Sequence, residues 1–399
     1  MATSFYSSLT TKVKVTLIYF FVAATLGLSL RMIQAGLLSG NFKHLLHTHS
    51  HIVLLGWLYN ALLILLQYGV FKKKEGPLNT VFWLSQLTFL GMLFSFPFQG
   101  YAFFSILFST LYLFCSYALV YYLFKYSKEL ENKNVAKLLR WSGIYLVLSS
   151  FGPFSLGFIM AKGLAETFWF KLSIYWFLHF LYNGFFALVV FAFVLNKLPN
   201  TTKTNAITWL MSLSVIPLYA LSVLWLDPHF SIYGIALIGS LFQLLAFGIL
   251  VYKQKIHSLF QQKWTRILLY LSVISYALKS IFQVFAVIPS VQLFLTETVS
   301  FSVIGFIHLV MLGFFTLFVI AVFIENNYLP ISKTVKLGIQ LLILGIILSE
   351  TLLFSQSIAV YFKSFQIPDF FTLLFWASAL MPVGIGLVVF GGKGFKFRG

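Results

Sequence analysis

The amino-acid sequence predicts an all-α polytopic membrane protein: twelve transmembrane helices in three pseudo-repeated four-helix units, with both termini cytoplasmic. Three observations lead to this class. Hydrophobic residues make up 60% of the chain and charged residues only 9%. The apolar residues come in runs of about 20, long enough for a helix to cross a hydrocarbon layer of about 30 Å. The basic residues gather in alternate loops.

The whole chain, 1–399, is predicted to form a single transmembrane domain. The loops between the apolar runs are short, so none of them holds a separate domain. The pseudo-repeats cover approximately 13–124, 137–251 and 264–390. In chain order, the predicted spans are Val15–Met32, Phe42–Phe71, Thr80–Phe98, Tyr101–Phe124, Trp141–Met160, Thr167–Leu195, Ala206–Leu226, Phe230–Val251, Ile267–Val287, Val299–Phe323, Leu337–Phe354 and Phe370–Phe390.

The net charge of +18 would favour a nucleic-acid partner in a soluble protein, but here the distribution of the charge gives a different explanation. With the N-terminus inside, most basic residues fall on the inner side, as the positive-inside rule expects. A missed or extra helix would disrupt this alternation. We therefore expect a multi-pass protein of the cell inner (plasma) membrane, with the lipid bilayer as a partner and no nucleic acid. The basic residues assigned to the outer side are Arg31, Lys43, Lys162, Lys171, Lys279 and Lys363.

Three of the eight histidines begin the same short motif, H-x-x-x-x-G-[FW]. They fall in the second, sixth and tenth predicted helices, and this spacing indicates the repeated four-helix unit. The glycine of each motif is expected to allow close helix packing and not to bind a ligand. The motifs run from His51 to Gly56-Trp57, from His179 to Gly184-Phe185 and from His308 to Gly313-Phe314.

The three motif histidines lie at a similar predicted depth, in the outer half of the bundle. This predicts a shared interior site for a metal or heme iron, which are strong partners of a buried imidazole. The alternative for any one of them is a simple interhelical hydrogen bond. In the second helix, His44, His47 and His51 share one face while His49 points elsewhere. His47 and His51 could chelate a metal, or they could form a solvent-facing polar turn.

The stretch His49-Ser-His51-Ile-Val-Leu-Leu-Gly56-Trp57 resembles the H-x-H-x-x-x-x-G-F stretch of NnrS-like proteins, within the heme-copper oxidase subunit I superfamily. The resemblance implies a pseudo-threefold arrangement with metal ligands from helices two, six, seven and ten. It matches His51 and His308 to the ligands of a b-type heme and His179 to a copper ligand. The predicted metal ligands are thus His51, His179 and His308, with His47 as a further candidate.

The chain also departs from that superfamily. The seventh predicted helix, Ala206–Leu226, has no histidine, and the tenth has only one. A standard oxygen-reducing binuclear centre therefore cannot be assembled, and we do not expect a proton-pumping oxidase. Arg31, Lys171 and Lys279 could pair with heme propionates, or could simply extend to the membrane surface. The acidic residues that could pair with these bases, or belong to a proton path, are Glu166, Glu297, Glu350 and Asp369.

The leading hypothesis is a heme-binding membrane protein, with copper as a further candidate cofactor, that acts in electron transfer or in handling nitric oxide or another diatomic ligand. Its partner would be a redox protein or that small ligand, and if it is an enzyme we expect a membrane oxidoreductase. The alternative is a twelve-helix transporter with a histidine-based cation or proton site. A third hypothesis is an assembly factor for respiratory complexes.

Overall fold

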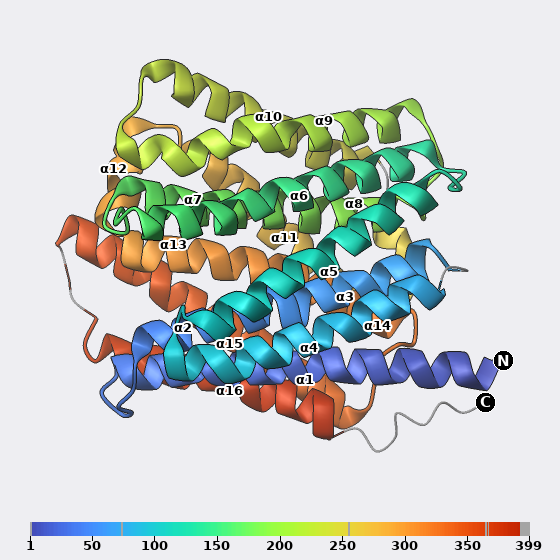
Figure 1. Cartoon of the computed structure of the whole chain (residues 1–399), viewed down its shortest axis with the longest axis horizontal. Helices are drawn as coiled ribbons and strands as arrows, with labels where there is room; N and C mark the ends of the chain where they lie inside the picture. The colour runs from blue at the N-terminus through green and yellow to red at the C-terminus, as the bar shows by residue number, and fades with distance from the viewer. Residues whose placement is uncertain (1, 73–74, 254–255, 364, 366, 392–399) are drawn as a thin grey trace.

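The structure is a computed structural model that describes residues 2–72, 75–253, 256–363, 365 and 367–391. Within these residues all regular structure is helical, and twelve helices are long and apolar enough to cross a membrane. The predicted class, an all-α polytopic membrane protein, is confirmed. The helices run roughly parallel to one axis of the bundle, and the first begins at the same end at which the last one finishes (Figure 1).

The first four spans use α-helical and π-helical segments. The second span is one continuous helix in which the two types alternate. In chain order, the elements are α1 (Ala2–Gln34), α2 (Phe42–His51), η1 (Ile52–Tyr59), α3 (Asn60–Ile64), η2 (Leu65–Val70), α4 (Glu75–Gln99) and α5 (Phe103–Ser127).

The next four spans repeat this plan, and the third of them ends in a 3-10 helix. The elements are α6 (Lys133–Ala161), α7 (Phe168–His179), η3 (Phe180–Phe186), α8 (Ala187–Leu195), α9 (Thr202–Leu218), η4 (Tyr219–Leu226) and α10 (Phe230–Lys253).

The last four spans contain one helix that the sequence did not predict. This helix, α12, has nine residues and is too short to span a membrane, so a search for long apolar runs misses it. The elements are η5 (Ile256–Leu259), α11 (Lys263–Phe285), α12 (Pro289–Glu297), α13 (Val299–His308), η6 (Leu309–Thr316), α14 (Leu317–Glu325), α15 (Lys333–Phe362) and α16 (Phe370–Phe390).

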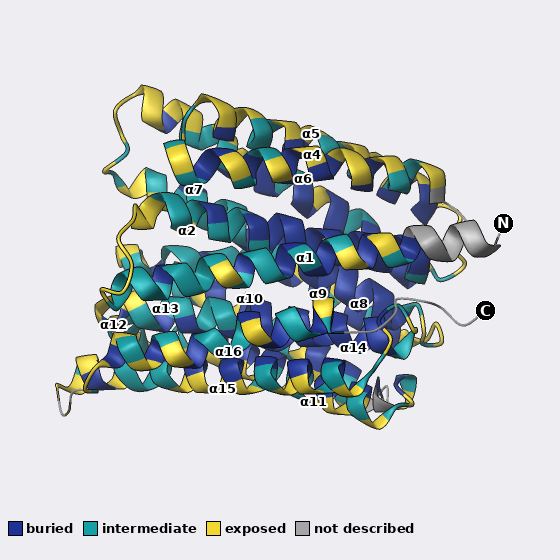
Figure 2. Cartoon of the chain, turned by 90° about the horizontal axis from the view of Figure 1, so that it is seen from below, coloured by how far each residue is buried: buried dark blue, intermediate teal, exposed yellow. Residues whose placement is uncertain are grey.

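The three spans that carry the motif histidines form the core of the bundle. In each of them, 89% of the most apolar window is buried, against 28–50% in the other nine spans. These central spans are Phe42–Val70, Phe168–Leu195 and Val299–Glu325. Buried residues accordingly concentrate in the middle of the bundle, with exposed residues around it (Figure 2). Each set of four consecutive spans therefore contributes its second helix to the centre.

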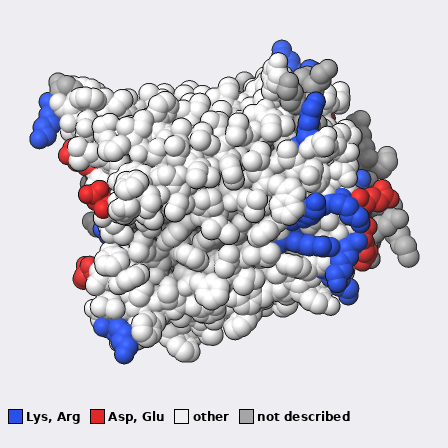
Figure 3. Space-filling view, turned by 90° about the horizontal axis from the view of Figure 1, so that it is seen from above, with Lys and Arg blue, Asp and Glu red and all other residues white. Residues whose placement is uncertain are grey.

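The remaining nine spans surround this core. Contacts of α5 with α6, of α10 with α11, and of α16 with α1 join consecutive sets of four, and the last contact closes the ring. Charged side chains gather at the two ends of the molecule and leave a wide uncharged belt between them (Figure 3). The belt is what a protein surrounded by hydrocarbon requires. Exposed basic residues at the end where α1 begins include Lys72, Lys128, Lys133, Lys203, Lys263 and Lys333.

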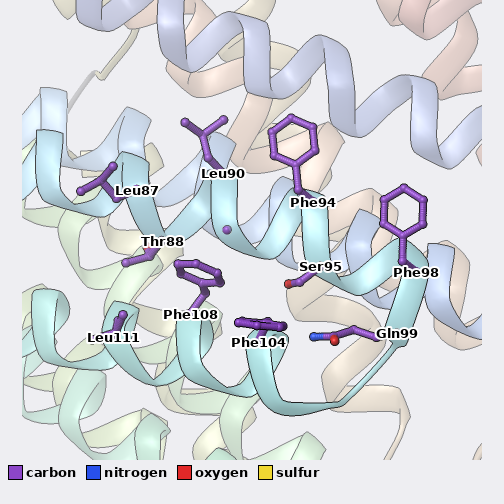
Figure 4. A pocket seen from close by; sticks show the side chains of 11 residues that line it. Leu87, Thr88, Leu90, Phe94, Ser95, Phe98, Gln99, Phe104, Phe108 and Leu111 are labelled. Carbon is purple, nitrogen blue, oxygen red and sulfur yellow. The ribbon is translucent and has the colours of Figure 1, made fainter.

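A shallow groove of about 620 Å³ lies on the outside of the bundle between α4 and α5 (Figure 4). Its wall is formed mainly by leucine and phenylalanine side chains, among them Leu90, Phe94, Phe104 and Phe108. None of the residues that line it is a histidine or carries a charge. The groove therefore belongs to the apolar outer surface, and the chemically interesting residues lie elsewhere.

Candidate functional site

Each H-x-x-x-x-G-[FW] motif coincides with a change in the backbone. A π-helical segment begins directly after His51, after His179 and after His308, as η1, η3 and η6. A π-helix has i→i+5 hydrogen bonds in place of i→i+4, is rare, and is often found at functional sites. The motif thus marks the same local structure in all three central helices.

The motif glycines have one role in common, which is close packing against the first helix of their own set of four. A Cβ added at Gly56 would lie 2.9 Å from Cδ1 of Tyr19 on α1. One at Gly184 would lie 2.5 Å from Cβ of Tyr145 on α6. One at Gly313 would lie 2.6 Å from Oγ of Ser275 on α11. The expectation that these glycines serve helix packing is confirmed.

The three motif histidines, by contrast, do not converge on one point. Among the described residues there is no group of three or more His, Cys, Asp or Glu placed to hold a metal ion. His51 donates from Nδ1 to the carbonyl oxygen of His47, 2.8 Å away, and its ring stacks on Phe96 of α4 with centroids 4.4 Å apart. The described side chains of these histidines are therefore not gathered around one point, and a shared cofactor site stays a prediction.

His179 is already satisfied by the protein. Its Nε2 lies 2.7 Å from the carbonyl oxygen of Val215 on α9, and its Nδ1 lies 3.3 Å from the amide nitrogen of Asn183. Because a carbonyl can only accept, Nε2 carries the proton and Nδ1 accepts from the amide. Both ring nitrogens are therefore engaged in this neutral imidazole, which is only 2% exposed. As placed, His179 offers no lone pair to copper.

His308 meets a different histidine from the one that the resemblance assigned to the heme. It interacts electrostatically with His49 of α2 and with Arg31 of α1. His49 donates from Nδ1 to the carbonyl oxygen of Ala23, 2.8 Å away, which leaves the Nε2 lone pair for another partner. Gly27 makes room for this ring, since a Cβ there would lie 2.9 Å from its Cε1.

One acidic residue also belongs to this region of the bundle. Glu350 of α15 is 8% exposed, and neither of its carboxylate oxygens has a hydrogen-bond partner. It interacts electrostatically with Arg31, whose Nη1 donates to Gln34 over 2.9 Å. A Cβ at Gly305, one turn before His308, would lie 3.5 Å from Glu350 Oε2. We call Arg31, His49, His308 and Glu350 the His49–His308 cluster.

The other predicted site residues lie outside this cluster. His47 packs edge-on against Tyr101, with centroids 4.5 Å apart, and its Nε2 is buried without a hydrogen-bond partner. Lys171 is exposed, with its Nζ 5.4 Å from the ring centroid of Trp225, as expected for a lysine that extends to the surface. Lys279, predicted near a heme propionate, is 1% exposed and donates to Gln243 of α10.

Comparison with known proteins adds no assignment, because no protein-family model and no curated protein matches the chain. Within the His49–His308 cluster, the residue that sequence reasoning did not single out is His49. A signal for it was present, because residues two apart on a helix point about 200° away from each other. His49 and His51 therefore cannot face the same neighbour, and only the packing of α1 and α13 decides which of them lies near His308.

Proposed function

We propose that this chain is a heme-binding integral membrane protein in which His49 and His308 would hold the iron of a b-type heme. It would act in electron transfer or in handling a small diatomic ligand such as nitric oxide. The observation that carries the proposal is that His308, on one central helix, lies within electrostatic range of His49 on another and of Arg31 on α1.

The residues present fit such a group. The hydrogen bond from His49 Nδ1 to a backbone carbonyl is the usual arrangement behind an imidazole that ligates through Nε2. Arg31 supplies a cation for a propionate, which is an anion that arginine recognises well. A heme held in this way supplies reversible one-electron chemistry, and ligation by two histidines favours electron transfer over ligand binding.

Other parts of the expected function have less support. Both ring nitrogens of His179 have protein partners, so the geometry gives no support for copper there. Copper binding at His179 stays a prediction. Lys279 is not part of the proposed heme environment, because its ammonium group bonds to Gln243 and it interacts with His179. An oxidoreductase activity would need a redox partner protein, which stays part of the proposal. For the membrane, we propose the plasma membrane, with the lysine-rich end of the bundle in the cytoplasm.

The test is an absorption spectrum of the detergent-purified, heme-supplemented protein, oxidised and reduced. We expect a Soret band and a reduced α-band that His49→Ala and His308→Ala each abolish. His51→Ala is the matched control from the same helix and should keep the spectrum, since its ring faces Phe96. If His51→Ala loses the heme and His49→Ala keeps it, the assignment to His49 is wrong. If the supplemented wild type shows no Soret band, the heme proposal fails altogether.

One observation favours the second candidate, a transporter with a proton site. The Glu350 carboxylate is buried at membrane depth without a hydrogen bond, which is costly for a charged group and typical of residues that bind protons in transporters. Proteoliposomes containing the protein and a pH-sensitive dye would then show proton uptake that Glu350→Gln abolishes. Equal rates in wild type, Glu350→Gln and empty liposomes would exclude this candidate.

A further inference from the structure

Lys279 is a buried lysine without a carboxylate partner in the described structure. It lies in α11 and is 1% exposed. Its ammonium group donates to Oε1 of Gln243 on α10, and Nζ lies 4.9 Å from the ring centroid of Tyr276. Among the residues that the structure describes, no carboxylate interacts with it. Because an ammonium group is expensive to bury unless a negative charge accompanies it, this arrangement is incomplete.

The histidine that interacts with Lys279 does not supply that charge. His179 of α7 interacts electrostatically with Lys279, but its hydrogen bonds to Val215 and Asn183 define a neutral imidazole. A histidine is neutral or positive and never negative, so it cannot compensate the lysine. A protonated Lys279 therefore has no negative partner among the described residues.

A second donor lies beside the ammonium group. Because the ammonium can only donate, it holds the Gln243 oxygen toward itself, and the amide nitrogen on the same carbon lies next to it. That nitrogen, Nε2, is buried without any hydrogen-bond partner, in a side chain that is 0% exposed. Two helices thus contribute two adjacent donors, and no acceptor among the described residues takes the amide N–H groups.

One unpartnered acceptor, on the same face of α11 as Lys279, limits the kind of ligand. Gln283, one turn after Lys279 on α11, has a buried Oε1 with no partner. Its backbone carbonyl accepts from Ser240 of α10 over 3.3 Å, which keeps the two helices together at this level. A small hydrated ion satisfies both needs, because the ion accepts from Lys279 and Gln243 while its water donates to Gln283.

We propose that Lys279 and Gln243 bind a small inorganic monoanion, a halide or an oxyanion of similar size. The site lies between α7, α10 and α11, on different helices from the His49–His308 cluster. It is independent of the proposed heme, because none of its residues is a proposed heme ligand.

The test measures thermal unfolding of the detergent-purified protein while sodium chloride or sodium nitrite replaces sodium gluconate at constant ionic strength. A ligand that binds the folded state raises Tm in a saturable way. We expect such a rise with at least one of the two anions, and its loss in Lys279→Met. Lys171→Met, which removes an exposed lysine of the same charge, is the matched control and should keep the rise. Equal Tm in all three salts, or an undiminished rise in Lys279→Met, would overturn the proposal.

Gln243→Glu provides a test that does not depend on the stability of the lysine variant. It places a carboxylate against the ammonium group, where the anion is expected to bind. This variant should no longer respond to chloride or nitrite, and its Tm in gluconate should reach or exceed that of the anion-saturated wild type. A Gln243→Glu protein that still gains stability from the anions would contradict the site.

Discussion

The histidines of the second span show that a shift of two positions along a helix changes which neighbour a side chain faces. The sequence predicted that this span carries a buried histidine, and the repeat singled out His51. The structure gives His51 a hydrogen bond within its own helix and a stacking contact with Phe96, while His49 faces α1 and interacts with His308. Periodicity alone could separate the two faces of the helix. It could not say which face meets the tenth span, because that depends on how three helices pack.

One side-chain hydrogen bond joins two of the central helices, and its contribution to the free energy of unfolding can be measured. Trp57 of η1 donates from Nε1 to Oγ1 of Thr316 of η6 over 2.9 Å, and Trp57 is fully buried. We predict a coupling free energy of about 0.6 kcal/mol between Trp57→Phe and Thr316→Val, since side-chain hydrogen bonds between membrane helices average about that value. Equilibrium unfolding of the four proteins of the cycle in mixed detergent micelles measures it.

The control for this cycle pairs Trp57→Phe with Thr208→Val. Thr208 lies on α9 and its hydroxyl bonds only within its own helix, to the carbonyl of Thr204. Distant sites without shared partners should be additive, so this second coupling energy should be close to zero. Equal coupling in both cycles would show that the loss comes from general loosening of the core and not from the hydrogen bond.

At the scale of the helices, the repeated motif was visible in the sequence, but its backbone was not. Histidine, glycine and an aromatic residue at fixed spacing predicted close packing, and the glycine contacts confirm it. The π-helical segments carry no signal in hydropathy, because the change from i→i+4 to i→i+5 hydrogen bonds alters the register and leaves the composition unaltered. Some helices in the structure are also longer than the predicted spans. The span predicted from Trp141 begins at Lys133, where Asn132 caps it, since polar first turns fall outside a hydropathy window.

Substituting a motif glycine should strain the packing between a central and an outer helix. In Gly184→Ala the new methyl group would lie 2.5 Å from Cβ of Tyr145, an atom that cannot move without moving α6. We predict a loss of about 1–3 kcal/mol in unfolding free energy, the usual cost of overpacking. Gly234→Ala on α10 is the control, because nothing lies within 4 Å of an added Cβ there.

The third motif glycine, Gly313, differs from the second, Gly184, in the atom that an added methyl group would meet. In Gly313→Ala the closest atom is the hydroxyl oxygen of Ser275, at 2.6 Å, so Ser275→Ala in the same chain should restore part of the lost stability. No small substitution at Tyr145 offers a comparable rescue for Gly184→Ala, since its own Cβ is the obstacle. Thermal unfolding in detergent compares the variants, and equal losses at Gly184 and Gly234 would show that the packing at the motif is looser than the contacts indicate.

For the whole molecule, composition and charge were enough to predict the class and the number of spans, since bilayer thickness sets the length of each helix. The order of packing follows less directly. That the second helix of each set lies at the centre is not apparent from hydropathy, because an outer helix faces lipid and is apolar as well. The mean hydropathies of the central spans, 1.7, 2.1 and 2.7, overlap with the 1.5–2.2 of the other nine. The contact of α16 with α1, which closes the ring, joins the two ends of the chain and has no local sequence signal.

The orientation of this ring in the membrane can be tested with single cysteines. Cys115 is the sole cysteine of the chain, so Cys115→Ser gives a background without thiols. Lys128→Cys lies in the loop after α5 and Lys162→Cys at the end of α6, and both positions are exposed at opposite ends of the bundle. With the lysine-rich end in the cytoplasm, a membrane-impermeant maleimide should label Lys162→Cys in intact cells and Lys128→Cys only after permeabilisation. The reverse pattern would invert the proposed orientation, and labelling of both in intact cells would contradict the placement of α6 as a full span.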